Sequence, residues 1–538
     1  MRRCGEHANT VRNTLTRQIE SLLDRPHAVV EARKDVRVKV DHDGQDTKAM
    51  RGGEGVGRNT AFAFATQLAT SAFTAILTLF LVRALDPREF GRFTLALAIA
   101  GLLTLPTDLG LSPAAARFIA ERRGNRAAAA AAFAEALWAK LAIAGAVATV
   151  LFALAGPISV AFGDRGLAWP LRGTALALAG QSLLLLVLQT FVALQRLSRN
   201  VVVVSVESAV ETSVSIALVL AGGGAAGAAF GRAVGYGFGL VLGLALVARS
   251  LGRGALEPRS PHRIGEVARY ARSLAVVDWA FAAFEQIDQL LIGVLLSTRA
   301  VGAFGAPLRL TAFLHYPGYA LANAVVPRLA RTEEHAPDGD SFARSLRLLF
   351  VVQAALTAPL LAWAQPITNL LLGTGYHQAD DVLRALAPYV FLSGLAPLVS
   401  LGANYLGEGA RRPRIAVATL ALNMAIDVAF LRSTGVVAAA IGTDVAFALY
   451  VPAHFAICAR ALGLSLRPLA VGFSRSLLAG GAATAALAFV GTSHLSLAQW
   501  LLGACAGTAA FVLVIALTGE LRALYPSRRP AGTVAVEP

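Results

Sequence analysis

Four polar residues on one apolar stretch of the chain have the spacing of a charged helix face. The four residues are Asp278, Glu285, Asp288 and Gln289. The last three follow Asp278 by 7, 10 and 11 positions. At about 100° per residue, a helix places all four within an arc of about 100°. In apolar surroundings such charges face water or pair with one another. The pattern therefore indicates either ion or proton coupling in a cavity, or an ion-pair cluster that holds helices together.

Two arginines inside other apolar stretches could meet these acids. Arg232 and Arg309 could neutralise the carboxylates, or their guanidinium groups could bind an anionic ligand through paired hydrogen bonds. Glu207 and Glu211 lie one helical turn apart, and Glu211 is the deeper of the two in its apolar stretch. The candidate cavity cations are thus Arg232 and Arg309, and the candidate coupling acids are Asp278, Glu285, Asp288 and Glu211.

Other polar residues within apolar stretches have simpler explanations. Asn423, Asp427 and Asp444 are explained by a polar contact between two adjacent helices. Glu135 and Lys140 are close enough to a helix end for their side chains to reach the membrane surface. These residues are not expected to have a functional role.

The composition excludes an ordinary soluble domain. The 538 residues are 56% hydrophobic and only 15% charged, and the mean hydropathy is +0.60. The net charge of +15 comes from short basic clusters between apolar runs, without the basic face that nucleic-acid binding needs. Cys4, Cys458 and Cys505 are far apart and lack the spacing of a disulfide framework or a metal site. No metal, cofactor or catalytic group is expected.

Apolar runs of about 18 to 27 residues predict about fourteen membrane-spanning helices. The expected ranges are 59–83, 93–112, 131–156, 170–194, 201–221, 225–248, 269–296, 303–326, 346–373, 382–406, 413–431, 436–459, 468–490 and 496–518. With this topology 24 loop arginines fall on one side, Arg412 among them, and 8 on the other. Because positive loops remain cytoplasmic, both termini are predicted to be cytoplasmic.

The chain also predicts an internal duplication. At an offset of 211 positions, Leu85, Arg88, Gly91 and Phe93 match Leu296, Arg299, Gly302 and Phe304. An even number of helices per repeat relates the halves by an axis along the membrane normal. The predicted organisation is a polar tail (1–57), an N-terminal lobe (58–248), a basic linker (249–267), a C-terminal lobe (268–462), two further helices (463–519) and a tail (520–538).

Several short motifs carry a family resemblance that extends over about residues 59–460. They are LDPREFG at 85–91, DLGL at 108–111, QIDQLLIG at 286–293, VGAF at 301–304, PRLAR at 327–331 and GVVAAAIGT at 435–443. Together they resemble the bacterial polysaccharide (O-antigen, Wzx-type) flippases of the multidrug/oligosaccharidyl-lipid/polysaccharide exporter superfamily. The related lipid II flippases look different in the first helix, where arginines and a glycine-rich segment are expected.

The resemblance implies an inner-membrane flippase that moves an undecaprenyl-pyrophosphate-linked oligosaccharide by alternating access for cell-surface polysaccharide biosynthesis. Arg232 and Arg309 would then attract the pyrophosphate. Membrane lipids are implied partners, H+ and Na+ remain open as coupling ions, and polysaccharide polymerase machinery is a candidate contact.

Three alternatives remain. The first is a cation-coupled small-molecule or drug efflux carrier of the same superfamily, for which a more apolar pocket is expected. The second is a cell-envelope membrane enzyme, which the short outer loops disfavour. The third is a major-facilitator transporter, whose basic motif is replaced by SPAAARFIAERRG at 112–124.

Overall fold

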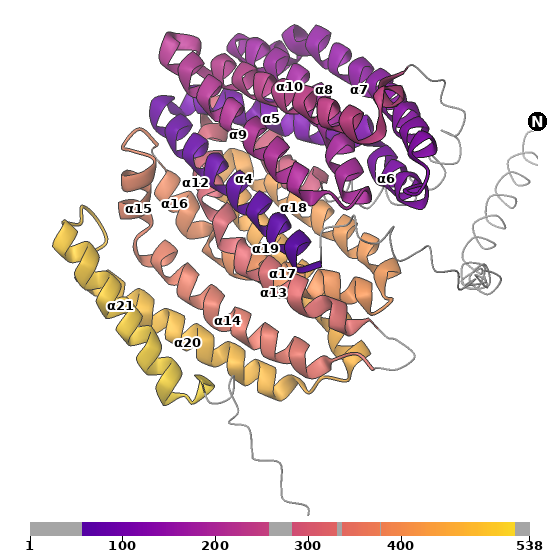
Figure 1. Cartoon of the computed structure of the whole chain (residues 1–538). Coiled ribbons are helices and arrows are strands. Elements are labelled where there is room, and N and C mark those ends of the chain that lie inside the picture. The colour runs from indigo at the N-terminus through magenta and orange to yellow at the C-terminus, as the bar shows by residue number, and fades with distance from the viewer. Residues whose placement is uncertain (1–55, 258–281, 331–335, 377, 522–538) are drawn as a thin grey trace, which may run out of the picture. The chain divides into compact units, whose positions relative to one another are not determined.

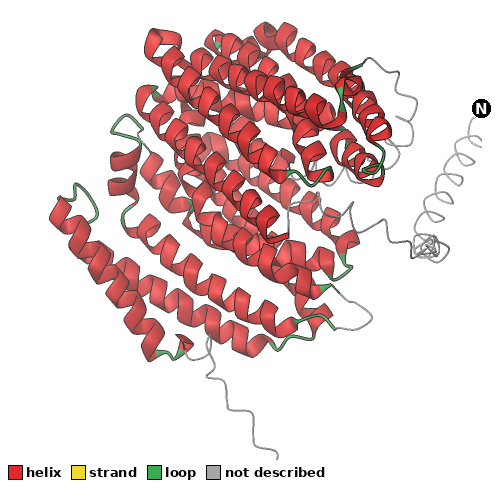
Figure 2. Ribbon diagram, in the orientation of Figure 1, coloured by secondary structure: helices red, strands yellow, loops and turns green. Residues whose placement is uncertain are grey.

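The computed structural model describes residues 56–257, 282–330, 336–376 and 378–521. Within these ranges the regular structure is helical, without a strand (Figure 2). Nearly all of the predicted tails and most of the basic linker lie outside the described residues. The candidate acid Asp278 lies outside them as well.

Helices before residue 258 place Glu211 opposite Arg232. The helices are α4 (Val56–Ala84), α5 (Pro87–Asp108), α6 (Leu111–Glu121), α7 (Arg126–Ala161), η2 (Arg165–Leu167), α8 (Ala168–Ala193), α9 (Leu197–Leu218), η3 (Val219–Gly223), α10 (Gly224–Leu251) and η4 (Arg253–Leu256). Helix α10 packs against both α8 and α9, and α4 packs against α9 (Figure 1). A Cβ atom placed on Gly235 would lie 2.6 Å from Glu211 Cβ, so only glycine permits this approach of α10 to α9.

Helices after residue 281 form the remainder of the structure. They are an unlabelled helix over 282–295, then α12 (Thr298–Thr311), η5 (Ala312–His315), α13 (Tyr316–Val325), η6 (Val326–Leu329), α14 (Gly339–Ala362), α15 (Ala364–Leu371), α16 (Ala379–Ala385), α17 (Ala387–Tyr405), η7 (Gly409–Arg411), α18 (Arg412–Thr434), α19 (Val437–Leu462), α20 (Leu466–Val490) and α21 (Leu497–Leu517). Helices α17 and α18 both pack against α19. The two halves of the chain meet where α5 packs against α12.

Helices α20 and α21, drawn in yellow, pack against each other, and α20 packs along α14 (Figure 1). The first residue of the predicted C-terminal tail, Glu520, fixes one end of this arrangement. Glu520 is fully buried, and its carboxylate pairs with Arg347 at 2.6 Å and with Arg475 at 3.2 Å. At the other end the indole N–H of Trp363 donates to the carbonyl oxygen of Leu487 at 3.1 Å. The last two helices are therefore bound to α14 at both ends.

Proline positions explain why several predicted spans appear as pairs of shorter helices. Pro317 lies in the first turn of α13, and Pro388 lies in the first turn of α17. Helices α16 and α17 meet at a bend of 46°. Proline is tolerated in a first turn but interrupts a helix interior, so it favours these breaks.

Length and composition identify nine candidate membrane spans in the described ranges, or ten if the bent pair α16–α17 is one span. Each of the fourteen predicted ranges overlaps a described helix. The all-helical, multi-pass membrane fold is confirmed, whereas the count of fourteen stays a prediction. Helices α12 and α13, with 14 and 10 residues, are too short to count as spans, and α9 and α10 are joined into one 55-residue stretch (197–251).

Lys140 does not reach the membrane surface, contrary to the sequence-based expectation. Its side chain is fully buried in α7, and its ammonium group donates to Asp108 and to Ser112. These partners flank the break between α5 and α6, where Leu109 and Gly110 have left-handed backbone angles. The buried ion pair accounts for the lysine, because pairing offsets part of the cost of removing the charges from water.

Candidate functional site

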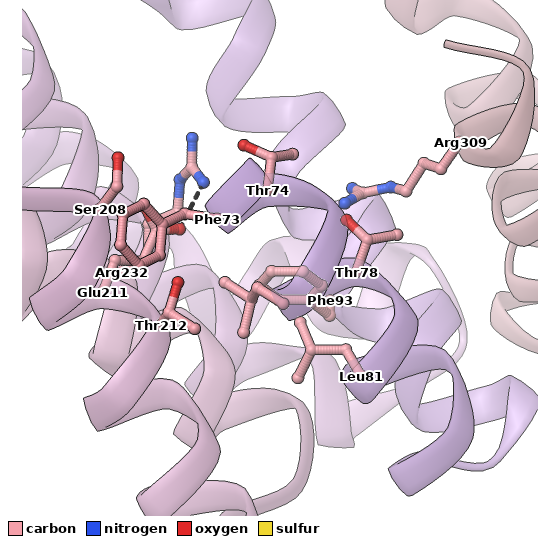
Figure 3. Close-up of a pocket in the computed structure, with 11 residues that line it drawn as sticks. Phe73, Thr74, Thr78, Leu81, Phe93, Ser208, Glu211, Thr212, Arg232 and Arg309 are labelled. Carbon is pink, nitrogen blue, oxygen red and sulfur yellow. Dashed lines mark hydrogen bonds and ion pairs between the residues drawn. The ribbon is translucent and has the colours of Figure 1, made fainter. Parts of the chain in front are cut away.

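A small cavity lies between α4, α5, α9, α10 and α12 and has an ion pair on one wall (Figure 3). Its volume is about 50 Å³. Arg232 Nη1 lies 2.7 Å from Glu211 Oε1, and Arg232 Nη2 donates to the hydroxyl of Tyr236 at 2.8 Å. The neighbouring Ser208 hydroxyl donates to the carboxylate of Glu207 at 2.9 Å. The predicted cation Arg232 is thus neutralised by the predicted acid Glu211.

Arg309 lies across this cavity from Arg232, on α12 (Figure 3). Within the described part of the chain it makes no hydrogen bond and has no carboxylate partner. Its guanidinium group lies over the rings of Phe90 and Phe93, 5.5 Å and 5.6 Å from their centres. Arg309 also lines a second, larger cavity. Among the described residues Arg309 is therefore a cation without an ion-pair partner. It borders two cavities and lies at the α5–α12 contact.

The larger cavity has a volume of about 600 Å³ and is lined by the helix 282–295, α12, η5, α13, α17, α18 and α19. Its aromatic lining residues are Phe284, Tyr319, Tyr389, Phe447 and Tyr450. Polar side chains, including Glu285, Ser393 and Ser400, are interspersed among them. A volume in this range, with aromatic faces and a few polar groups, is typical of a small-molecule pocket.

Asp288 belongs to a buried polar cluster at the wall of the larger cavity. It accepts a hydrogen bond from Thr443 Oγ1 at 2.6 Å and another from the side-chain amide of Asn423. Asn423 Oδ1 and both carboxylate oxygens of Asp427 are buried without a hydrogen-bond partner. A Cβ atom on Gly442 would lie 2.7 Å from Asp427 Oδ1 and 3.0 Å from Asn423 Oδ1. These two oxygens therefore lie close together, next to Gly442.

Buried oxygens without partners are costly, and two carboxylates close together repel. A bound proton or a small hard cation would relieve both costs, because such cations prefer carboxylate, amide and hydroxyl oxygens. Among the described residues there is no group of three or more His, Cys, Asp or Glu side chains that could hold a metal ion. The cluster therefore suits H+ or a monovalent cation better than a transition metal.

A second polar cluster joins the loop between α7 and α8 to the beginnings of α5 and α12. Asp164 accepts hydrogen bonds from Arg92 Nη2 at 2.6 Å, Arg88 Nε at 3.2 Å and Thr298 Oγ1 at 2.7 Å. Burial opposes ionisation of this carboxyl, but the hydrogen bonds from Arg92, Thr298 and Arg88 outweigh it and hold the pKa of Asp164 below its usual range. Through Thr298, this cluster links the two halves of the chain.

The structure brings together some of the predicted site residues. Arg232 pairs with Glu211, whereas Arg309, Glu285 and Asp288 line the larger cavity. Neither arginine pairs with Glu285 or Asp288 among the described residues. The roles proposed for these side chains stay predictions.

The sequence was interpreted as placing Asn423 and Asp427 at a polar contact between adjacent helices, and their four-residue spacing puts both on one face of α18. What the sequence did not indicate is that Asp288 joins them, accepting a hydrogen bond from Asn423. The signal that could have predicted the cluster is the combination of the α18 pair with Asp288 and Thr443. These two residues lie in the motifs QIDQLLIG and GVVAAAIGT that carry the family resemblance. Asp444, considered with them, lies apart and accepts from the backbone N–H of Tyr389 at 2.7 Å.

Comparison with known sequences gives two family matches. The family described as "Polysaccharide biosynthesis protein" matches residues 56–333, which are 278 of the 538 residues. The family described as "Lipid II flippase MurJ" matches residues 314–511. The probable low-salt glycan biosynthesis flippase Agl15 of Haloferax volcanii is 23% identical over 176 residues. That match covers 32% of this chain and 37% of the relative.

Two solved structures have a similar fold. Lipid II flippase MurJ in an inward closed conformation aligns with a TM-score of 0.68 at 9% identity, over 86% of this chain and 99% of that chain. An inward-facing multidrug resistance MATE family transporter of the MOP superfamily aligns with a TM-score of 0.58 at 14% identity, over 74% of this chain and 96% of that chain. At such low identity these similarities establish the fold alone.

Proposed function

The chain belongs to the polysaccharide biosynthesis protein family, and from this premise we propose that it is a flippase for a lipid-linked oligosaccharide. The substrate is an undecaprenyl-pyrophosphate-linked saccharide that passes from the inner to the outer leaflet of the inner membrane. Transport proceeds by alternating access between the two halves of the chain, with both termini in the cytoplasm, and without a chemical reaction.

The observation that carries this proposal is the position of Arg309. A guanidinium group without an anionic partner is costly inside a membrane protein, so a substrate anion is its natural counter-ion. The fork of N–H donors matches the oxygens of a pyrophosphate. Because Arg309 lines both cavities, a pyrophosphate bound there lies between the halves that must separate. Arg232, already paired with Glu211, contributes less positive charge to that anion.

The buried oxygens of Asp288, Asn423, Asp427 and Thr443 support cation coupling. We favour Na+ over H+ because an amide oxygen and a hydroxyl oxygen lie beside the two carboxylates, and such neutral oxygens are ligands for a hard cation. Drug efflux, the alternative from the sequence, is less well supported. Arg309 has no ion-pair partner among the residues that the structure describes, and its positive charge disfavours the cationic drugs that such a carrier would export.

The test is transport of a fluorescent undecaprenyl-pyrophosphate oligosaccharide by the purified protein in proteoliposomes. Arg309→Gln is expected to lower the flipping rate at least about tenfold, because a hydrogen bond between charged groups contributes about 1.5 to 3 kcal/mol. Arg309→Lys should retain part of the rate, since the charge remains but the fork is lost. The control is Arg299→Gln, on the same helix but exposed and outside both cavities.

A wild-type protein that does not flip this lipid above the rate of empty liposomes contradicts the proposed function. In cells, depletion of the protein should cause a complete lipid-linked repeat unit to accumulate on the inner leaflet, as measured by mass spectrometry. No accumulation would contradict the proposal independently of the reconstituted assay.

A further inference from the structure

Arg412 is a second arginine whose side chain lines the larger cavity. It is the first residue of α18, and its position in the sequence groups it with the basic residues of the loops. In the structure its Nη2 donates to Ser400 Oγ at 3.0 Å, its only hydrogen bond among the described residues. Its Nε is buried without a partner. No carboxylate within the described ranges pairs with this guanidinium group.

The groups around Arg412 are held in place by their own contacts. The hydroxyls of Ser400 and Tyr450 lie 2.9 Å apart. His454 is fully buried. Its Nδ1 lies 2.9 Å from the carbonyl oxygen of Tyr450, and its ring centre lies 4.2 Å from that of the tyrosine. Apart from the bond to Ser400, the N–H donors of Arg412 have no hydrogen-bond partner among the described residues, and the Tyr450 hydroxyl lies next to that of Ser400.

We propose that Arg412, Ser400 and Tyr450 form a subsite for an acidic sugar residue of the transported saccharide. This inference rests on the proposed function and deepens it, because it assigns a charge to the glycan. The carboxylate of a uronic acid accepts from the free N–H groups of Arg412, and the sugar hydroxyls exchange hydrogen bonds with Ser400 and Tyr450.

Two features favour a sugar acid over the pyrophosphate at this subsite. First, the subsite has one cation, Arg412, next to the hydroxyls of Ser400 and Tyr450. A uronic acid has the matching arrangement, because its single carboxylate is next to the hydroxyls of the sugar ring. Second, Arg309 provides a separate cation in the same cavity. The aromatic residues Tyr389 and Phe447 line the space as well, and they offer apolar faces to a sugar ring.

The test is binding of free monosaccharides to the full-length protein in nanodiscs, measured as protection from thermal unfolding. The probes are D-glucuronate, D-glucose and inorganic phosphate at equal ionic strength. D-Glucuronate is expected to protect the wild type at concentrations at least about tenfold lower than glucose, since a charge-assisted hydrogen bond accounts for a difference of that size. Arg412→Gln should abolish this preference while protection by glucose is retained.

Two further variants make the result specific. Arg414→Gln, an exposed neighbour that does not line the cavity, should keep the wild-type preference. Arg309→Gln should keep it too, although it lowers flipping. The inference is overturned if Arg412→Gln retains the preference for glucuronate over glucose, if neither sugar protects, or if inorganic phosphate protects as well as glucuronate. Each of these outcomes is independent of the flipping assay, which tests the proposed function separately.

Discussion

Gly91 on α5 and Gly302 on α12 lie against each other's helix in a reciprocal manner. A Cβ atom on Gly91 would lie 1.7 Å from the carbonyl oxygen of Thr298, and one on Gly302 would lie 1.9 Å from that of Pro87. Gly91 and Gly302 are 211 positions apart, and so are Pro87 and Thr298. This is the offset of the predicted duplication. Reciprocal contacts of this kind are those expected across a two-fold axis.

The first prediction concerns this helix crossing. Gly302→Ala should separate α5 from α12 and lower the melting temperature of the detergent-solubilised protein by several degrees, because the added methyl group overlaps the backbone. Gly145→Ala is the control: Gly145 lies within α7 with open space around it, and alanine is favoured by about 0.5 to 1 kcal/mol in a helix interior. Equal melting temperatures for Gly302→Ala and wild type would contradict the close contact.

The second prediction concerns the pair Arg232–Glu211. Arg232→Gln leaves the carboxylate of Glu211 buried without its cation, and about 2 to 4 kcal/mol of stability should be lost. The double variant Arg232→Gln with Glu211→Gln should be destabilised by less than the sum of the single variants, with a coupling of about 1 to 3 kcal/mol. Unfolding measured for the four proteins checks this, and strictly additive effects would show that the side chains do not interact.

The third prediction concerns the cluster around Asp427. Na+ should raise the melting temperature of the wild type relative to the same concentration of K+, since a ligand that binds only the folded state stabilises it. Asp427→Asn should lose most of this difference. Asp444→Asn should keep it, because Asp444 contacts the backbone of Tyr389 instead of the cluster. A wild type equally stable in Na+ and K+, but driven by a pH gradient, would identify H+ as the coupling ion.

The fourth prediction concerns Asp164. Its lowered pKa means that its pairing stabilises the fold wherever the unfolded carboxyl is ionised, above about pH 4, and that this contribution is lost only in strong acid. Asp164→Asn should therefore lower the stability by about 2 kcal/mol, nearly constant from about pH 8 to about pH 5.

The control for Asp164 is Asp381→Asn. Its pair with Arg384 is exposed on both sides, so a change of no more than about 0.5 kcal/mol is expected. A stability difference for Asp164→Asn that disappears already near pH 6 would contradict the lowered pKa. An effect no larger than that of Asp381→Asn would show that the cluster at the start of α5 is not stabilising.

Much of the architecture follows from the sequence alone. Long apolar runs require helices, because a lipid environment leaves no other partner for the backbone polar groups. The motifs between about residues 59 and 460, taken as a set, were sufficient to indicate a polysaccharide flippase, and the match to the polysaccharide biosynthesis protein family confirms this resemblance at the level of the family. The narrower O-antigen, Wzx-type assignment stays a prediction, as does the division into six, six and two helices.

What the sequence could not determine is which charges meet. Arg232 and Glu211 are 21 positions apart on different helices, and hydropathy says nothing about the rotation of one helix against another. Asn423 and Asp427 looked like a simple helix contact until the approach of Asp288 and Gly442 placed several oxygens without partners in one spot. The sequence groups Arg412 with the loop residues, but in the structure it lines the larger cavity. These positions depend on close packing between distant segments, and only the tertiary structure fixes that packing.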